Sequence, residues 1–219
     1  MDDIRLQKLK RLRELGIMPY AANFTRTHVL AEGKDLPEGT EAKICGRIVL
    51  LRDMGKMTFL TLQDHTGRFQ VLIRQEDFGE NYDTMLSLMD LGDFIGVGGT
   101  RITTKTGEPT LQAKAWVMLS KALSQPPEKW HGVQNQEVAW RQRYLDLTSN
   151  RETFERFRLR SLFVRKLREF YWKQGFEEME TPVLTTAASG ALATPFVTKH
   201  EAYNMDVYLR IATETYLKE

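Results

Sequence analysis

The chain has 219 residues, of which 42% are hydrophobic and 27% charged, a composition typical of a soluble globular protein of one or two domains. The net charge of only +2 means that any nucleic-acid site must come from a local arrangement of side chains rather than from overall charge. No apolar run is long enough to span a bilayer, and the charged N-terminus lacks the apolar core of a secretory signal. The basic stretch Arg5–Arg13 leaves a mitochondrial presequence open, although Asp2 and Asp3 argue against one. The single cysteine, Cys45, cannot form an internal disulfide, which favours a cytoplasmic location.

The first predicted element is a helix over Ile4–Leu15, where leucine recurs at every third position. Gly16 and Pro19 follow it, as is typical beyond the end of a helix. Basic residues lie between the leucines: Lys8, Lys10, Arg11 and Arg13. The pattern favours a surface helix with solvated charges, and a basic strip beside RNA is the alternative. We assign residues 1–42 to this helix and a lead-in.

Five strand-like runs follow, separated by short turns that contain glycine. They are Lys43–Arg52, Met57–Asp64, Arg68–Arg74, Asp93–Thr103 and Thr110–Leu119. A helix is predicted over Asp77–Leu91, between the third and fourth runs. Five strands with a helix after the third are the plan of the OB-fold, a small Greek-key barrel that binds oligonucleotides. The sequence therefore predicts an OB-fold over residues 43–124, and the glycines at 96, 98 and 99 indicate a bulge in its fourth strand.

Alternation along the second and third strands predicts which side chains face outward. Thr58, Leu60 and Leu62 share one face of the second strand, which leaves Phe59 on the other. Phe69, Val71 and Ile73 share one face of the third strand, which leaves Gln70 and Leu72 on the other. An outward ring can stack on an unpaired base, an amide can read a base edge, and Arg52 and Arg68 can hold phosphates. The pattern alone leaves open the alternative that Phe59 packs under the neighbouring helix and Gln70 is merely solvated.

A second domain is predicted after a linker over residues 125–150, which contains Pro126 and Pro127. Its first element is a helix over Glu155–Lys173 with a strongly apolar face, ended by Gly175. An extended segment follows, with Pro182 where a hydrogen-bond donor would be missing from a sheet, and Val207–Ile211 is predicted as a short strand. Residues 151–219 thus form a second α/β piece.

Signatures of metal binding and of nucleophilic catalysis are missing from the sequence. The four histidines are scattered without ligand spacing, and no glycine-rich phosphate loop of the common kinds occurs. Cys45 lies within a strand and is typical of a buried small hydrophobe. The residues alone therefore indicate a nucleic-acid-binding barrel and a second domain, without a reaction and without a metal site.

The segment Gly175–Leu184 resembles motif 1 of the class II aminoacyl-tRNA synthetases: a helix and glycine, then alternating apolar residues and a proline. In that family motif 1 builds the dimer interface, so the resemblance implies a homodimer that uses Gly175, Phe176 and Pro182. Together with Arg141–Leu147 and the preceding OB-fold, this segment is similar to the subgroup that charges lysine, aspartate and asparagine. The implied fold is mixed α+β, with an N-terminal helix and five-stranded OB-fold followed by the incomplete beginning of an antiparallel α/β catalytic domain.

Five segments resemble the lysyl enzymes in particular: Leu12–Ile17, Phe24–His28, His131–Glu137, Ser189–Phe196 and Tyr208–Lys218. The fourth departs from the lysyl pattern at Ser189 and Thr194. The fifth departs at Thr213 and Thr215, where that family has proline and leucine. The resemblance covers nearly the whole chain.

The resemblance implies lysine-binding roles for Gly190 and Glu214. A substrate ammonium needs a carboxylate, because a buried unpaired charge is very costly, and a glycine lets the substrate approach the backbone. Without the resemblance, the pattern around Glu214 favours an ordinary acid in the first turn of a helix.

In the barrel, the resemblance places Arg52, Phe59 and Gln70 at positions that contact the tRNA anticodon. Glu108 falls at a position that reads a base edge, and Arg68 is expected to hold RNA beside them. This agrees with the outward-face interpretation of Phe59 and Gln70.

The reaction implied by the family is activation of lysine with ATP and Mg²⁺, followed by transfer of the lysyl group to tRNA-Lys, by positioning and electrostatics. We expect the ATP and Mg²⁺ ligands of motifs 2 and 3 to lie beyond Glu219, so that this chain is an N-terminal fragment without activity of its own. One alternative is a stand-alone module that binds tRNA or dimerises without catalysis. Another is an aspartyl or asparaginyl relative, which Glu214 and the Ser189–Phe196 loop weaken.

Overall fold

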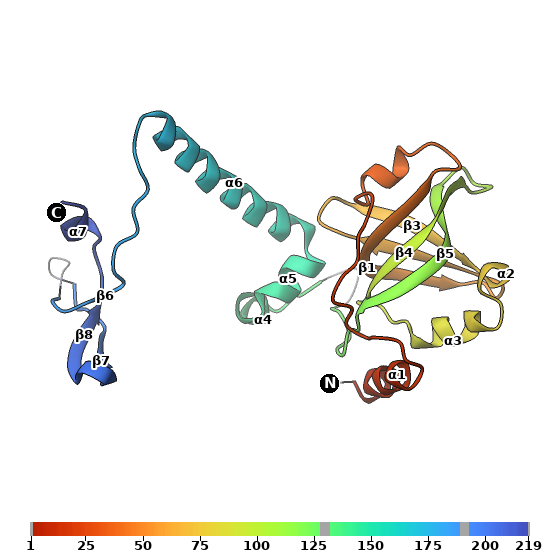
Figure 1. The fold of residues 1–219 in the computed structure, drawn as a ribbon, viewed down its shortest axis with the longest axis horizontal. Coiled ribbons are helices and arrows are strands. Elements are labelled where there is room, and N and C mark those ends of the chain that lie inside the picture. Colours follow the sequence, from red (N-terminus) through yellow and green to blue (C-terminus); the bar gives the residue numbers. More distant parts are fainter. Residues whose placement is uncertain (1, 128–131, 189–192, 219) are drawn as a thin grey trace. The chain divides into compact units, whose positions relative to one another are not determined.

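The computed structural model describes residues 2–127, 132–188 and 193–218, which belong to two compact units, Met1–Asn150 and Arg151–Glu219 (Figure 1). The first unit contains α1 (Asp3–Glu14), a short 3₁₀ turn (Glu32–Lys34), β1 (Glu41–Asp53), β2 (Met57–Gln63), β3 (Arg68–Arg74), α2 (Gln75–Phe78), α3 (Asn81–Leu88), β4 (Phe94–Thr103), β5 (Pro109–Ser120), α4 (Gln136–Arg141) and α5 (Arg143–Ser149). Within the described residues, no helix is both long and apolar enough to cross a membrane.

The five strands of the first unit close into a barrel in the order β1-β2-β3-β5-β4. Neighbouring strands are antiparallel except for β3 and β5, which run parallel. This is the predicted five-stranded barrel, and the predicted OB-fold is confirmed. The helix predicted over Asp77–Leu91 is broken into α2 and α3, because Gly79 adopts a φ of 56° that ends the first turn.

The barrel core follows the predicted alternation. Leu60 and Leu62 from β2 and Val71 and Ile73 from β3 are buried, while Phe59 and Gln70 between them are partly exposed. Leu72 shares the outward face of β3 with Gln70, as predicted, and yet is buried. Only 3% of its surface is accessible, because α2 folds back onto β3 and β5.

The bulge predicted from the glycines is present in β4, where the register with β5 shifts between Gly98 and Gly99. At Gly99, a Cβ atom would lie 2.0 Å from the carbonyl oxygen of Gln112. The two backbones therefore approach so closely that only glycine fits there.

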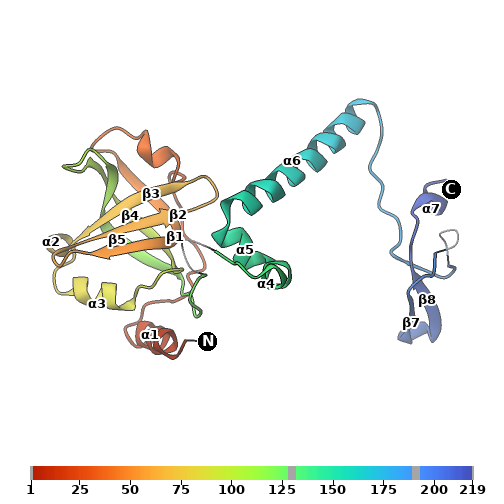
Figure 2. The same ribbon diagram turned by 180° about the vertical axis from the view of Figure 1, so that it is seen from behind.

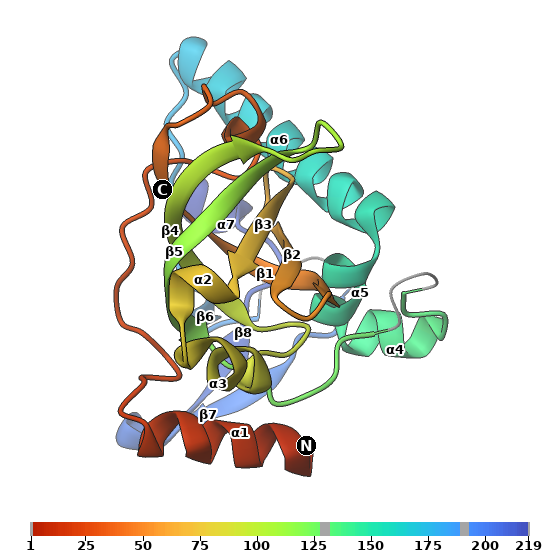
Figure 3. The ribbon, with the colours of Figure 1, turned by 90° about the vertical axis from the view of Figure 1, so that its right-hand side faces the viewer.

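Helix α1 lies beside α3 (Figure 3), and basic side chains help to dock it against the barrel. Arg5 is buried and donates through Nη1 to the carbonyls of Leu91 and Ala122, at 3.0 and 3.2 Å. Lys8 forms an ion pair of 2.7 Å with Asp90. The expectation of a helix with wholly solvated charges is therefore wrong for Lys8, while the other basic residues of the strip are exposed.

A buried ion cluster lies where α3 leads into β4. The side chain of Lys121 has no exposed surface, and its ammonium lies 2.5 Å from Asp90 and 2.7 Å from Asp93. Burial raises the pKa of the Asp93 carboxyl above its usual value, against the opposing effect of hydrogen bonds from Lys121 and two backbone amides. Burial acts the same way on Asp90, but hydrogen bonds from Lys121 and Lys8 outweigh it and lower the pKa of that carboxyl. Two cations, Lys121 and Lys8, thus neutralise two partly desolvated carboxylates, and Lys121 is the one that contacts both.

The lead-in between α1 and β1 runs across the barrel and bonds to several of its strands. Its backbone hydrogen bonds are Lys121 N to Pro19 O, Ala21 N to Leu119 O, Thr27 N to Lys43 O and Gly39 N to Arg101 O, at 2.8 to 3.2 Å. The Phe24 ring covers Gly96, where a Cβ atom would lie 2.4 Å from the ring. The lead-in is therefore part of the barrel's wall.

Asp64 joins this lead-in to the turn between β2 and β3. One carboxylate oxygen accepts from Thr66 and Gly67, and the other accepts from the Leu30 amide at 3.1 Å. Burial acts to raise the pKa of the Asp64 carboxyl, but these hydrogen bonds outweigh it and hold that pKa below its usual value.

We expect acid to loosen this turn. The pKa of Asp64 is lower in the folded chain than in the unfolded chain. The stability that Asp64 contributes to the folded chain is therefore complete above the pKa of the unfolded chain, and is lost as the pH falls through the pKa of the folded chain. The measurement is the free energy of unfolding from neutral pH to about pH 3, below the unfolded carboxyl pKa. Asp64→Asn should lose less stability over that range than the unsubstituted chain, and equal losses would contradict the role assigned to Asp64.

The second unit contains α6 (Arg151–Lys173), β6 (Leu184–Thr185), β7 (Val197–His200), a short 3₁₀ turn (Glu201–Tyr203), β8 (Met205–Leu209) and α7 (Glu214–Leu217). Its strands form an antiparallel sheet in the order β6-β8-β7, and Figure 2 shows the β7–β8 hairpin. The predicted long helix is present and begins four residues before Glu155, at Arg151. The predicted Val207–Ile211 strand is found two residues earlier, as β8.

Candidate nucleic-acid interface

One row of side chains crosses the outer face of the barrel. Arg52 on β1 pairs with Phe59 on β2, Phe59 with Leu72 on β3, and Leu72 with Gln112 on β5. Residues directly opposite on neighbouring strands have Cβ atoms about 5 Å apart. Phe59 is therefore flanked by an exposed guanidinium on one side and the buried Leu72 on the other. This row supplies an aromatic surface beside a cation.

Gln70 lies in the next row, between two threonines. It pairs with Thr61 on β2 and with Thr110 on β5. Its Nε2 donates a hydrogen bond of 2.8 Å to Thr110 Oγ1, which in turn donates to the carbonyl of Glu108 at 3.1 Å. Gln70 is thus tied into a hydrogen-bonded chain instead of being merely solvated, and it lies diagonally beside Phe59 on the same face.

Glu108 stands at the end of this chain, in the turn between β4 and β5. The turn is closed by hydrogen bonds between Thr104 and Glu108 of 3.0 Å and by Gly107 with a φ of 84°. The Glu108 side chain is exposed. Because β5 runs parallel to β3, this turn emerges beside Gln70 on the same side of the barrel.

Arg68 is separated from the Arg52 row. It lies on the same outward face of β3, but its partner is Gln63, whose side-chain oxygen accepts from Arg68 Nε at 2.7 Å. Arg52 and Arg68 therefore stand at opposite ends of the face, about 13 Å apart along the strand direction by the usual rise per residue. The structure brings Arg52, Phe59, Gln70 and Glu108 onto one surface and leaves Arg68 at its edge.

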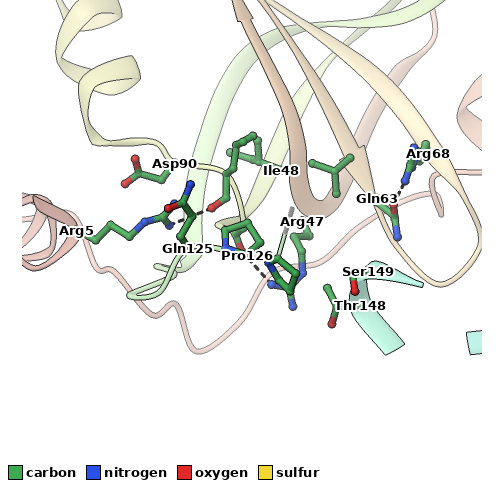
Figure 4. Close-up of a pocket in the computed structure, with 14 residues that line it drawn as sticks. Arg5, Arg47, Ile48, Gln63, Arg68, Asp90, Gln125, Pro126, Thr148 and Ser149 are labelled. Carbon is green, nitrogen blue, oxygen red and sulfur yellow. Dashed lines mark hydrogen bonds between the residues drawn. The ribbon is translucent and has the colours of Figure 1, made fainter. Parts of the chain in front are cut away.

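Arg68 also lines a pocket of about 450 Å³ in the first unit (Figure 4). Arg47 lines the same pocket, with its guanidinium 4.4 Å from the ring centre of Phe94 and a hydrogen bond of 3.2 Å to Gly92 O. Burial lowers the pKa of Arg47. Pro126 and Pro127 form part of the pocket wall. Sequence reasoning did not identify Arg47, because its strand position gives no signal of the pocket.

The predicted residues of the second unit lie on exposed backbone. Gly175 follows α6 with a φ of 84°, Phe176 is 61% exposed, and Pro182 is exposed. The Glu214 side chain is 70% exposed in the first turn of α7 and pairs with Lys218 at 2.5 Å. Gly190 lies outside the described residues.

Thr110 was missed by the sequence analysis, although it is the direct partner of Gln70. Its only local signal is its place at the start of a strand. The contact depends on the parallel pairing of β3 with β5, across the whole α2–α3–β4 connection. Alternation within a strand cannot predict which distant strand lies beside it.

The described residues contain no group of three or more His, Cys, Asp or Glu side chains placed to hold a metal ion.

Two protein families match successive parts of this chain. Residues 42–119 match the OB-fold nucleic acid binding domain family, and residues 135–219 match the class II tRNA synthetases (D, K and N). The chain is 45% identical to a lysine–tRNA ligase of Dehalococcoides mccartyi, 43% to one of Enterococcus faecalis and 44% to one of Pelotomaculum thermopropionicum, each over 98% of this chain.

The chain spans 43–45% of the length of these relatives. The two matched regions of this chain coincide with the barrel and with the segment that runs from α4 to the end of the chain. The chain therefore matches the class II tRNA synthetases (D, K and N) over residues 135–219, and over nearly all of its own length it is similar to a part of several lysine–tRNA ligases.

Proposed function

We propose that this chain supplies the anticodon-reading part of a lysyl-tRNA synthetase. The polypeptide that contains it activates lysine with ATP and Mg²⁺ to form lysyl-adenylate, and then transfers the lysyl group to the 3′ end of tRNA-Lys in the cytoplasm. The observation that carries the proposal is the outer barrel face with Phe59 beside Arg52 and Gln70, in a chain 45% identical to lysine–tRNA ligases.

Each residue of this face has a separate role in the proposal. Phe59 stacks on an unpaired anticodon base, and Gln70 bonds to a base edge. Arg52 and Arg68 neutralise phosphates on either side. Glu108 accepts a hydrogen bond from a base at the rim. By the genetic code, the second and third anticodon bases of a lysine tRNA are uridines, which this face must recognise.

We assign residues 43–124 to anticodon binding and residues 151–219 to the catalytic region. There, Glu214 pairs with the ammonium of lysine and Gly190 lets the substrate approach the backbone. A carboxylate that now pairs with Lys218 in solvent can exchange that partner at small cost, since exposed ion pairs are weak.

We also propose that the second unit forms a homodimer through motif 1. The support is a group of large apolar side chains that are more than half exposed in the single chain: Leu159, Phe163, Phe170, Trp172, Phe176, Met179 and Val183. Apolar surfaces of this kind are usually covered by a partner or by further structure.

The alternative function is a non-catalytic module that binds tRNA, which would have the same barrel. Lysine-dependent ligation by the polypeptide that contains this chain would distinguish a synthetase from such a module.

Phe59→Ala should weaken binding of a lysine anticodon stem-loop by about 1–3 kcal/mol, because it removes the stacking surface for one base. The measurement is a titration of the loop at fixed salt, followed by a salt series. The salt dependence should stay unchanged, since Phe59 contacts no phosphate.

Met57→Ala is a matched control, because Met57 is also an outward side chain of β2 and lies 40% exposed at its end. It should bind the loop as the unsubstituted chain does. Equal and salt-sensitive binding of the loop by all three proteins would contradict anticodon reading by this face.

A further inference from the structure

A fully buried hydroxyl lies between the two polar residues that are proposed to read bases. Thr110 has no exposed surface. Its Oγ1 accepts from Gln70 Nε2 at 2.8 Å and donates to the carbonyl of Glu108 at 3.1 Å. A hydroxyl has one proton to give, so the proton is used on Glu108 and a lone pair faces Gln70.

This arrangement determines which end of the Gln70 amide faces Thr110. The oxygen and nitrogen ends of an amide have nearly the same shape, so hydrogen-bond partners decide between them. If the amide rotated by half a turn, Thr110 would have to give its proton to Gln70 and would lose its bond to Glu108. The orientation in the structure makes two hydrogen bonds and the rotated one makes one, at a hydroxyl with no exposed surface.

We propose that Thr110 is a positioning residue that holds the Gln70 amide in one orientation and thereby makes Gln70 distinguish uracil from cytosine. The proposal rests on the anticodon-reading function given above. Uracil presents an N3–H donor between carbonyl acceptors, while cytosine presents an N3 acceptor beside an amino donor. An amide that rotates freely bonds to either edge, whereas a fixed amide matches one of them.

The decisive variant is Thr110→Val, which replaces the hydroxyl by a methyl group of similar size. The probes are a lysine anticodon stem-loop and two loops in which the second or the third uridine is replaced by cytidine. At the position read by Gln70, the preference for uridine over cytidine should fall roughly tenfold, the scale of one bidentate base contact. The preference at the other position should stay unchanged.

Two matched variants separate positioning from a structural effect. Thr110→Ser keeps the hydroxyl and should keep the preference. Thr61→Val makes the same substitution on the other side of Gln70, where the described structure records no side-chain bond between the two residues, and should also keep the preference. A Thr110→Val protein that binds all three loops more weakly by one common factor would overturn the proposal.

A double substitution tests whether Thr110 acts through Gln70. Gln70→Leu identifies the position that Gln70 reads, and adding Thr110→Val to it should change the preference no further. A further fall would overturn the positioning role. If the unsubstituted chain itself shows no preference for uridine, the proposed function fails. If it prefers uridine and Thr110→Val keeps that preference, only the role of Thr110 fails.

Discussion

Lys121→Met should destabilise the barrel by about 3–5 kcal/mol, because it leaves the fully buried Asp93 carboxylate without its cation. Asp93 has no exposed surface, and Lys121 is its ion-pair partner at 2.7 Å. Methionine fills a similar volume, so the loss reflects charge rather than a cavity. The pKa of Asp93, already raised by burial, should rise further as the carboxyl takes up a proton. The measurement is the denaturant midpoint of the barrel's unfolding transition.

Two further variants make this prediction specific. Lys8→Met removes a cation from the same cluster, but of the two carboxylates Lys8 pairs with the partly exposed Asp90, and its own side chain is 24% exposed, so the loss should be much smaller. Adding Asp93→Asn to Lys121→Met should recover part of the stability, because the neutral amide still accepts a backbone hydrogen bond without a buried charge. A double variant no more stable than Lys121→Met would contradict the explanation by charge.

Gly99→Ala should destabilise the same barrel by about 3 kcal/mol, the upper range for overpacking. The added Cβ atom would lie 2.0 Å from the Gln112 carbonyl oxygen, a backbone atom that cannot turn aside. Relief requires β4 and β5 to separate at the bulge, and β5 also carries Thr110. We therefore expect loop binding to weaken together with stability, measured by thermal unfolding and by titration.

The neighbouring glycine is a matched control for that substitution. At Gly98, an added Cβ atom would meet its nearest neighbours at 3.8 and 3.9 Å, which is ordinary contact. Gly98→Ala should therefore change the free energy of unfolding by less than about 1 kcal/mol. Alanine loses less backbone entropy on folding than glycine, which favours the substituted protein. Similar effects of the two substitutions would mean that strand propensity, not the close approach at the bulge, sets the cost.

The local parts of this fold follow from the sequence, since period-two alternation decides which side of a strand is buried. That reasoning places Phe59 and Gln70 outward and predicts the bulge at Gly98 and Gly99. Alternation within one strand does not predict contacts between segments that are distant in the sequence. The burial of Leu72 depends on α2 folding back, and the hydrogen bond from Gln70 to Thr110 depends on which strands pair in parallel.

The ion cluster shows the same limit. Lys121, Asp90 and Asp93 are ordinary charges in the sequence, and only the closed barrel brings them together out of water. In the second unit, the helix is predicted from its apolar spacing. The role of Glu214 depends on a pocket around it, and its surroundings in the described structure are solvent and Lys218.

The path of the lead-in has a practical consequence for moving this barrel into another protein. A graft cut at residue 43 would contain all five strands except the first residues of β1, yet it would lose the Phe24 ring over Gly96 and the Leu30 amide on Asp64. It would also lose Arg5 and Lys8 from the edge near the ion cluster. A graft of this barrel should therefore contain residues 2–124, because the first third of that segment supplies these contacts to the strands and loops of the barrel.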